Sequence, residues 1–366
     1  MKQRITGFDV ARAYAVFGML VVNFNFAFGV FGNNTLFRQF ENLFVGNSTS
    51  IFIMLAGIGL SLMRGGSNST AEQKLLRSVV LRRSWFLFAT GLLLYSWWPG
   101  DILHFYGGYM HIAAFLLFVP RRYYLVTACC AIAVFHILLF IIPVNTGWSF
   151  DTTRYIDFWT IKGFLRNTLY NGWNSMFPWF AYFMAGMWLG RLDWNNAKTK
   201  RNIFLWGMGI FTFFQLLRVV ARNNMFDERV TQYIMSEYFP PYLPFMAITA
   251  GYAMMVITAC VYIAERLQGK RIIQYLATAG RMTLTHYIIH LTAGMLLLSW
   301  FSGKRYTGYW HNGVPVSPVY IFLFAAAFFI MQVVFSVVWS QRFSHGPVEW
   351  LMRKFSDGQW RRGADH

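Results

Sequence analysis

Charged residues are scarce in this sequence, where Asp, Glu, Lys and Arg together make up only 13% of 366 residues. A soluble domain usually carries about 25% charged residues, so the composition excludes an ordinary soluble globular protein. Hydrophobic residues reach 56% and aromatic residues 20%, and long apolar runs recur along the whole chain. The composition therefore predicts an all-α polytopic membrane protein.

Other patterns are also missing. The chain lacks the alternating segments of about ten residues that a membrane β-barrel requires. Its three cysteines, Cys129, Cys130 and Cys260, lie within apolar runs and show neither disulfide nor zinc spacing. The basic N-terminal stretch has no small-residue cleavage site, and its apolar part contains Asp9 and Arg12. It therefore predicts a first membrane helix and not a removed signal peptide.

The apolar runs predict ten membrane spans, at about residues 9–31, 49–63, 80–98, 102–119, 123–143, 174–190, 202–217, 241–264, 282–301 and 317–340. With the N-terminus in the cytoplasm, 21 of the 32 Lys and Arg residues fall in cytoplasmic segments and 9 in outer loops. Cytoplasmic loops collect Lys and Arg, so both termini are predicted to be cytoplasmic. The net charge of +18 is then a topology signal, and no nucleic-acid partner is expected.

Neither an internal repeat nor a soluble domain is evident, so we predict one integral-membrane domain over residues 1–366, with halves 1–190 and 191–366. The long aromatic outer loops 32–48, 144–173 and 218–240 either fold back over the helices to roof a cavity or lie in the membrane interface. Gly186 and Gly190, four residues apart, predict close helix packing.

Several ionisable residues lie at predicted membrane depth, where each costs roughly 2.5–3.5 kcal/mol on insertion scales and so usually faces a partner or a cavity. Asp9 and Arg12 are three residues apart and share a helix face. They are expected to form an ion pair. It is either a structural clamp near the cytoplasmic boundary, or Arg12 helps to receive an anionic cosubstrate from the cytoplasm. Arg281 opens the ninth span; His286 and His290 follow on one face, but no third ligand accompanies them and no metal site is predicted. His290 is expected to act as a proton carrier or hydrogen-bond partner.

The stretch PGDILHFYGGYMH, residues 99–111, places Asp101 one helical turn before His104. Asp101 can cap the following helix, which would explain it without any chemistry. A carboxylate can also orient an imidazole and stabilise its protonated form, and histidine is the usual general base near neutral pH. His104 is therefore a candidate base, whereas His111 and the lone His136 are expected to pack.

Six stretches appear in the order of a known family, and they extend over nearly the whole chain: RITGFDVARAYAVFGMLVVNF, NSTSIFIMLAGIGLSL, GDILHFYG, NGWNSMFPWFAYFMAGMWLGR, GRMTLTHYIIH and HGPVEWLMRKF. The sequence resembles the bacterial YeiB-like membrane proteins, often labelled heparan-α-glucosaminide N-acetyltransferase-like. The resemblance implies a transmembrane acyltransferase fold of about ten or eleven helices. It also implies that acetyl-CoA or another acyl-CoA enters from the cytosol and that an acceptor amine or hydroxyl binds on the opposite side of the membrane.

By this resemblance, Arg12 and Arg281, with Asp9, would lie toward the nucleotide, and His104 toward the acceptor. Asn23 and Asn174 would be polar residues that position the substrate. The eukaryotic heparan enzyme carries its catalytic histidine in the loop after the first helix, but the corresponding loop here contains no histidine. That assignment is therefore not carried over. Asn174 also stands where many relatives would have histidine.

The sequence thus predicts a membrane-embedded acyltransferase of the bacterial inner membrane that modifies a saccharide or another envelope component. His104 is the predicted base, Asp101 orients it and His290 assists, while Arg12, Arg281 and Asp9 bind the acyl-CoA without a metal. The lipid bilayer is the expected partner, and a homodimer is left open. The alternative is a small-solute or lipid transporter or flippase that uses the same Asp, Arg and His residues, although the chain lacks evident inverted repeats.

Overall fold

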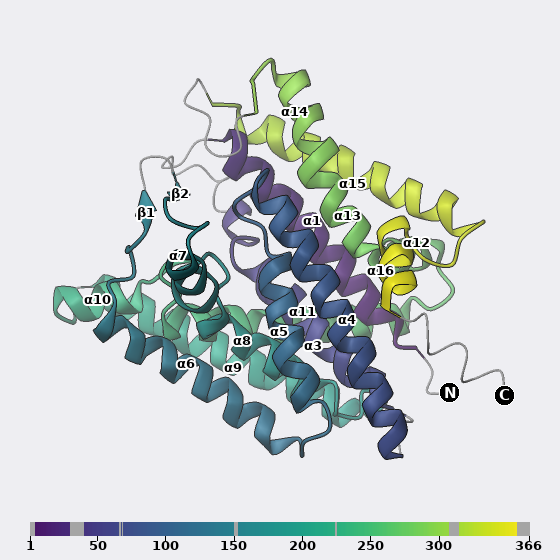
Figure 1. Cartoon of the computed structure of the whole chain (residues 1–366), viewed down its shortest axis with the longest axis horizontal. Coiled ribbons are helices and arrows are strands. Elements are labelled where there is room, and N and C mark those ends of the chain that lie inside the picture. The colour runs from purple at the N-terminus through teal and green to yellow at the C-terminus, as the bar shows by residue number, and fades with distance from the viewer. Residues whose placement is uncertain are drawn as a thin grey trace. The chain divides into compact units, whose positions relative to one another are not determined.

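The computed structural model describes residues 4–29, 40–65, 67, 69–149, 153–223, 225–306 and 315–356 (Figure 1). These residues are mostly helical, with one two-stranded antiparallel sheet that pairs Trp148 with Tyr155 and Ser149 with Arg154. The chain divides into two compact units. Unit 1 comprises Met1–Phe52 and Asp193–Pro347, and unit 2 comprises Ile53–Leu192 and Val348–His366.

Unit 1 contains α1 (Thr6–Phe28), α9 (Ala197–Arg222), α10 (Glu228–Ile234), α11 (Leu243–Arg266), α12 (Arg271–Gly280), α13 (Thr283–Ile289), η2 (His290–Gly294), α14 (Met295–Ser302) and α15 (Pro318–Ser340). Unit 2 contains α4 (Thr70–Tyr95), α5 (Leu103–Leu116), α6 (Arg122–Ile141), β1 (Trp148–Ser149), β2 (Arg154–Tyr155), α7 (Ile161–Arg166), η1 (Asn167–Asn171), α8 (Met176–Leu189) and most of α16 (Pro347–Ser356). Helix α3 (Asn47–Met63) is shared by the two units, and η1 and η2 are π-helical.

Each of the ten segments predicted to span the membrane is helical over most of its length. Within the described residues, seven helices are long and apolar enough to cross a membrane: Thr6–Phe28, Phe40–Met63, Arg122–Ile141, Ala197–Arg222, Leu243–Arg266, Thr283–Ser302 and Pro318–Ser340. The all-helical membrane class is thus confirmed.

The other three predicted spans correspond to α4, α5 and α8. Helix α4 opens with a charged stretch that includes Glu72, Lys74 and Arg77. Helices α5 and α8 have 14 residues each, which gives about 21 Å at a rise of 1.5 Å per residue, short of a hydrocarbon core of about 30 Å. The count of ten spans and the cytoplasmic position of both termini stay predictions.

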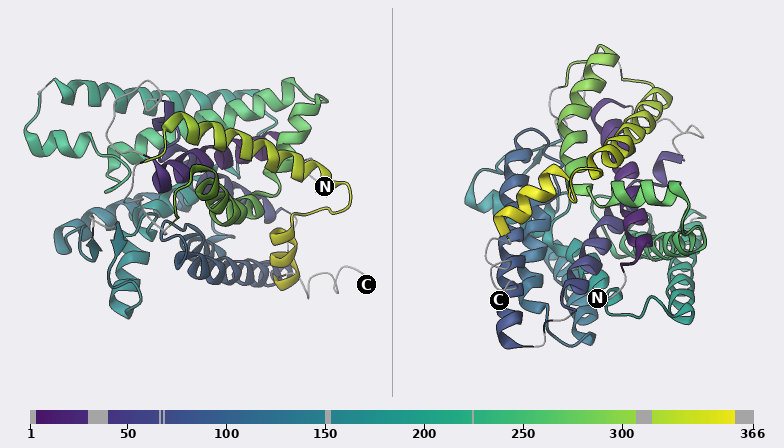
Figure 2. Two further views of the ribbon diagram at one scale, coloured as in Figure 1. Left: turned by 90° about the horizontal axis from the view of Figure 1, so that it is seen from above. Right: turned by 90° about the vertical axis from the view of Figure 1, so that its right-hand side faces the viewer.

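Helix α1 makes most of its contacts with helices that come much later in the sequence. It packs against α11, α12 and α15, and Figure 2 shows α15 lying alongside α1. Glycines permit the close approach, because a Cβ atom at Gly7 would lie 2.3 Å from the Val261 Cα and one at Gly280 would lie 1.8 Å from the Asp9 carbonyl oxygen. Unit 1 is therefore assembled around the first helix, so the two units do not coincide with successive halves of the chain.

In unit 2, small residues bring α3 and α8 into backbone contact. A Cβ atom at Gly186 would lie 2.1 Å from the Met54 carbonyl oxygen, and one at Gly57 would lie 2.1 Å from the Phe183 carbonyl oxygen. A Cβ atom at Gly190 would lie 2.9 Å from the Ile58 carbonyl oxygen. The packing role predicted for Gly186 and Gly190 is confirmed.

We expect Gly186→Ala to lower the melting temperature of the detergent-solubilised protein, because overpacking should reduce the free energy of unfolding by about 1–3 kcal/mol. The added methyl group meets main-chain atoms that no rotamer change can move. Gly209→Ala in α9 is the matched control, since nothing lies within 4 Å of its Cβ position and alanine favours helix by up to about 1 kcal/mol. Equal melting temperatures for the two variants would show that the α3–α8 contact does not require glycine.

Candidate functional site

Asp101 and His104 form a hydrogen-bonded pair at the start of α5. The His104 backbone N–H and the His104 Nδ1 both lie 3.1 Å from the Asp101 Oδ2. The first contact satisfies one of the backbone N–H groups left unpaired at a helix N-terminus, and the second orients the imidazole. The capping and orienting roles weighed from the sequence are thus compatible, because one oxygen does both.

This contact determines which ring nitrogen of His104 carries the lone pair. A carboxylate oxygen accepts hydrogen bonds, so the Nδ1–H donates to Asp101 and the Nε2 is left as the acceptor of a neutral imidazole. His104 and Asp101 are both 0% exposed, and the Nε2 has no hydrogen-bond partner within the described part of the chain. The arrangement supplies what a general base needs, namely an oriented ring with an unengaged lone pair.

Closely packed residues surround the pair. A Cβ atom at Gly91 of α4 would lie 2.1 Å from the His104 backbone nitrogen and 2.6 Å from the Asp101 Oδ2. The Tyr95 ring meets the His104 ring edge-on with centroids 5.6 Å apart, and the Phe158 ring does so at 6.0 Å. Phe158 also stacks on Tyr95 at 3.6 Å. The segment after α6 thus folds back over His104, as one of the two interpretations of loop 144–173 expects.

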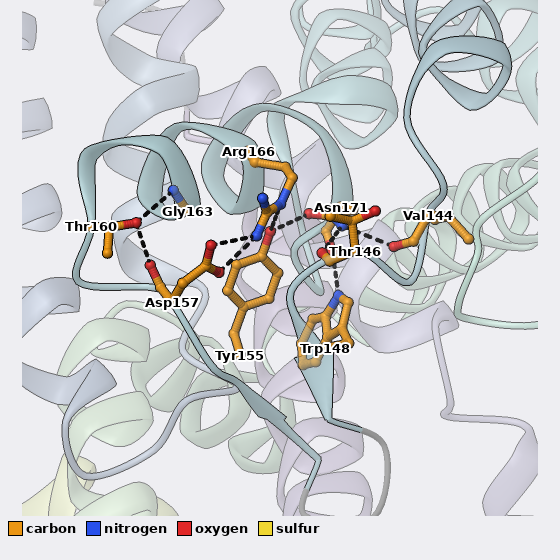
Figure 3. Close-up of polar contacts among 9 residues, drawn as sticks. All are labelled: Val144, Thr146, Trp148, Tyr155, Asp157, Thr160, Gly163, Arg166 and Asn171. Atoms are coloured by element: carbon orange, nitrogen blue, oxygen red, sulfur yellow. Dashed lines mark hydrogen bonds and ion pairs between the residues drawn. The ribbon is translucent and has the colours of Figure 1, made fainter.

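A polar network holds this segment in its folded form (Figure 3). The Arg166 Nη2 donates to both Asp157 carboxylate oxygens, at 2.6 and 2.9 Å, and the Arg166 Nε donates to the Tyr155 hydroxyl at 2.7 Å. The Tyr155 hydroxyl donates in turn to the Asn171 Oδ1 at 2.7 Å. The Asn171 Nδ2 donates to the carbonyl oxygens of Val144 and Thr146, each at 2.8 Å.

The protonation states of this network agree with its hydrogen bonds. Burial raises the pKa of Tyr155 to about 12, although the hydrogen bond from Arg166 works in the opposite direction. The phenol is therefore neutral at physiological pH and can donate to Asn171. Burial acts to lower the pKa of Arg166, but the hydrogen bonds and charge interactions with Tyr155 and Asp157 together outweigh burial, and the pKa is raised. Since Asp157 directly precedes Phe158, the ion pair fixes the residue that covers His104.

We expect Asp157→Ala to expose His104. Loss of a charge-assisted pair worth about 1.5–3 kcal/mol should speed modification of the His104 ring by diethyl pyrocarbonate about ten-fold, as measured by peptide mass spectrometry. Asp193→Ala is the control, because that exposed carboxylate accepts a local hydrogen bond from the Asn195 N–H. An unchanged rate in Asp157→Ala would mean that the ion pair does not hold Phe158 over the histidine.

The remaining predicted residue in unit 2 is Asn174. It is 2% exposed and lies just before α8, where its carbonyl oxygen accepts a hydrogen bond from the Tyr109 hydroxyl. This bond ties the start of α8 to α5, the helix that carries His104. A role of Asn174 toward a substrate stays a prediction.

In unit 1, Asn23 of α1 and His290 of η2 are brought together across 267 residues of sequence, with 2.9 Å between the Asn23 Nδ2 and the His290 Nε2. The His290 Nδ1 lies 3.1 Å from the His286 carbonyl oxygen, to which it must donate. The His290 Nε2 therefore accepts from the Asn23 amide. In this arrangement the lone pair of His290 is engaged, which favours its interpretation as a hydrogen-bond partner over that of a proton carrier.

Asp9 is the centre of a charge cluster at the other end of α1. Its carboxylate accepts from the Arg12 Nη1 at 2.6 Å and from the Arg4 Nε at 2.7 Å. The side chain of Asp9 is 3% exposed, that of Arg12 22% and that of Arg4 64%. The predicted Asp9–Arg12 ion pair is confirmed, whereas Arg4 was missed because it lies outside the predicted span.

Arg281 directly follows Gly280, whose backbone contacts Asp9. Arg281 is exposed, and its guanidinium donates to the Thr278 Oγ1 at 2.8 Å. Within the described residues, no group of three His, Cys, Asp or Glu side chains could hold a metal ion.

Double-mutant cycles will measure how strongly Arg12 and Arg4 are each coupled to Asp9. We expect a coupling free energy of about 1–3 kcal/mol between Asp9→Ala and Arg12→Ala, because that pair is largely buried. Coupling of Asp9→Ala with Arg4→Ala should be below about 1 kcal/mol, as for exposed ion pairs. The free energy of unfolding is measured by SDS titration in mixed micelles. Stronger coupling of Asp9 to Arg4 than to Arg12 would contradict a structural clamp between Asp9 and Arg12.

Two family models match the chain. The model described as "Heparan-alpha-glucosaminide N-acetyltransferase, catalytic" matches residues 4–226, and the one described as "Protein of unknown function (DUF418)" matches residues 183–359. The 39.9 kDa protein in the amylase 3′ region of Bacillus acidopullulyticus is 22% identical over 96% of this chain and 94% of its own length. The protein YxaH of Bacillus subtilis is 27% identical over 28% of this chain and 24% of its own length.

Proposed function

The chain belongs to the family of the heparan-alpha-glucosaminide N-acetyltransferase catalytic domain, and from this premise we propose that it transfers an acyl group across a membrane. The donor is a cytoplasmic acyl-CoA, with acetyl-CoA as the first choice. The acceptor is a hydroxyl or amine of a saccharide or another envelope component on the outer side. The observation that carries the proposal is the buried Asp101–His104 pair with its unengaged Nε2.

In the proposed reaction, the His104 Nε2 removes the proton of the acceptor as the acceptor oxygen or nitrogen bonds to the thioester carbonyl carbon. Asp101 stabilises the imidazolium that results. The carbon–sulfur bond then breaks, and the proton is returned to the departing thiolate of coenzyme A. The acceptor gains the acyl group, the thioester loses it, and no redox change or metal is required.

The donor is proposed to bind at the cytoplasmic end of α1. The Arg281 guanidinium fits an anionic phosphate, because its hydrogen bond to the neutral Thr278 hydroxyl engages only the Nη2. Arg12, held by Asp9, would supply a second cation of fixed orientation. Asn23 is proposed to fix the orientation of the His290 ring by its hydrogen bond to the Nε2. Asn174 is proposed to position α8 beside α5 through its carbonyl oxygen.

This chemistry implies a membrane topology. We propose ten spans with both termini in the cytoplasm of a bacterium, so that residues 144–173 lie on the outer face of the inner membrane. Three of these spans would be the shorter or more charged helices α4, α5 and α8, which can cross beside longer helices where the bilayer is thinned. A second copy of the chain is an open possibility as a partner.

We expect His104→Gln to lower kcat/KM for acyl transfer by about 10²–10⁴-fold, the usual contribution of a general base. His136→Gln should keep the wild-type rate, because that side chain contacts the Ile132 carbonyl oxygen of its own helix. The assay uses the full chain in proteoliposomes with radiolabelled acetyl-CoA supplied on one side and a panel of saccharides and amines on the other.

Two results would contradict the proposal in different ways. Full activity of His104→Gln would remove His104 as the base. Absence of both acyl-CoA binding and transfer across the panel, with solute flux that needs no acyl-CoA, would instead favour the transporter alternative.

A further inference from the structure

The C-terminal helix α16 exposes apolar side chains and buries polar ones, which is the reverse of a helix on the surface of a soluble protein. Trp350, Leu351 and Phe355 are 54%, 49% and 57% exposed. Glu349 and Ser356, which share the opposite face at a spacing of seven residues, are buried. An amphipathic helix turns its apolar side toward the less polar surroundings. The surroundings that suit the outward face of α16 are therefore apolar.

Three contacts place α16 against α4 (Figure 1). The Arg82 Nη1 donates to the Ser356 carbonyl oxygen at 3.3 Å, and the Arg83 Nε donates to the Ser356 Oγ at 3.2 Å. The centroids of the Phe86 and Phe355 rings are 6.0 Å apart. A cation that donates to the last carbonyl groups of a helix stabilises that end, so α4 holds the C-terminal end of α16.

These contacts lie where α4 changes from charged to apolar. Residues 70–83 include five charged side chains, whereas residues 84–95 include none. Trp85, just past this change, is 56% exposed, and tryptophan is enriched where a membrane meets water. Helix α16 therefore meets α4 at the level of a membrane surface.

The length of α16 agrees with a position in that surface. Its ten residues give about 15 Å at a rise of 1.5 Å per residue, half of a hydrocarbon core of about 30 Å. A helix of this length, with one apolar face and flanking cations, lies in the plane of the interface and does not cross the bilayer.

The same helix carries positive charge that suits an anionic lipid. Arg353 and Lys354 are exposed in its last turn. The Lys354 Nζ lies 5.1 Å from the centroid of the Trp350 ring, so the lysine stem follows the aromatic side chain and carries its ammonium group toward the polar boundary. Across α16 and residues 82–86, four Lys and Arg side chains stand against one carboxylate, that of Glu349. This excess favours a negatively charged lipid surface over a neutral one.

We propose that α16 is an interfacial helix that binds the anionic phospholipids of one leaflet. Trp350, Leu351 and Phe355 lie at the boundary between headgroups and acyl chains, and Arg353 and Lys354 contact lipid phosphates. The leaflet is the one at the charged end of α4. The inference is independent of acyl transfer, because it uses none of the residues assigned to the donor, the acceptor or the base.

The first test measures lipid selection by native mass spectrometry of the full chain, released from nanodiscs of equal parts phosphatidylglycerol and phosphatidylcholine. We expect the wild type to retain phosphatidylglycerol preferentially. Replacement of Arg353→Gln together with Lys354→Gln should lower this preference about five-fold for each charge removed. Lys198→Gln with Arg201→Gln, at exposed positions of α9, removes the same charge elsewhere and should keep the wild-type preference. An equal loss in both double variants would overturn selection by α16.

The second test measures hydrogen–deuterium exchange of the backbone amides of α16 in nanodiscs. We expect exchange to be slower in phosphatidylglycerol than in phosphatidylcholine. Leu351→Ser should speed exchange in phosphatidylglycerol about five-fold, because a half-exposed leucine loses its contact with acyl chains. Leu267→Ser is the matched control, since that leucine is 39% exposed and follows α11; it should leave the exchange of α16 unchanged.

Three results of the second test would overturn the inference. Equal exchange of α16 in the two lipids would remove the preference for anionic headgroups. Equal protection by inorganic phosphate in detergent without phospholipid would assign the cations to free phosphate. Protection that occurs only when two copies of the chain share a nanodisc would assign the apolar face of α16 to a second copy.

Discussion

The hydrogen bond from the His104 Nδ1 to Asp101 is the constraint on which the candidate site depends, and it exists because α4 carries glycine at position 91. Any larger residue there would collide with the His104 backbone and with the Asp101 carboxylate. Close packing of α4 on α5 therefore holds Asp101 against His104. The hydrogen bond between them places the proton of the neutral imidazole on the Nδ1, so the Nε2 is left as an acceptor. Burial then shields this lone pair from water.

The two compact units divide the chemistry between them. Unit 2 holds the buried histidine and the segment that packs over it, where the acceptor is proposed to bind. Unit 1 holds the Asn23–His290 pair and the arginines Arg12 and Arg281, whose positive charges suit the proposed phosphate-bearing donor. The proposed transfer would therefore draw on both units.

Contacts between residues close in sequence could be predicted well. The Asp9–Arg12 pair follows from a spacing of three along a helix, and the Asp101–His104 pair follows from a capping residue three positions before its partner. The close packing of α3 at Gly186 and Gly190 follows from the spacing of small residues. The all-helical membrane class follows from composition. Contacts between residues far apart in sequence could not be predicted, because they depend on the path of the loops and on the packing of distant helices. Asn23 contacts His290 across 267 residues of sequence, and Phe158 contacts His104 across 54 residues.

The most direct measurement is ¹⁵N nuclear magnetic resonance of histidine-labelled protein in lipid bilayers, with the His104 signals assigned by their loss in His104→Gln. We expect a neutral ring that is protonated and hydrogen-bonded at the Nδ1, with an Nε2 that has the chemical shift of an unprotonated, unbonded nitrogen. Addition of a sugar acceptor should shift the Nε2 signal and leave that of the Nδ1 in place. A ring protonated at the Nε2, with the Nδ1 as its lone-pair nitrogen, would contradict the account.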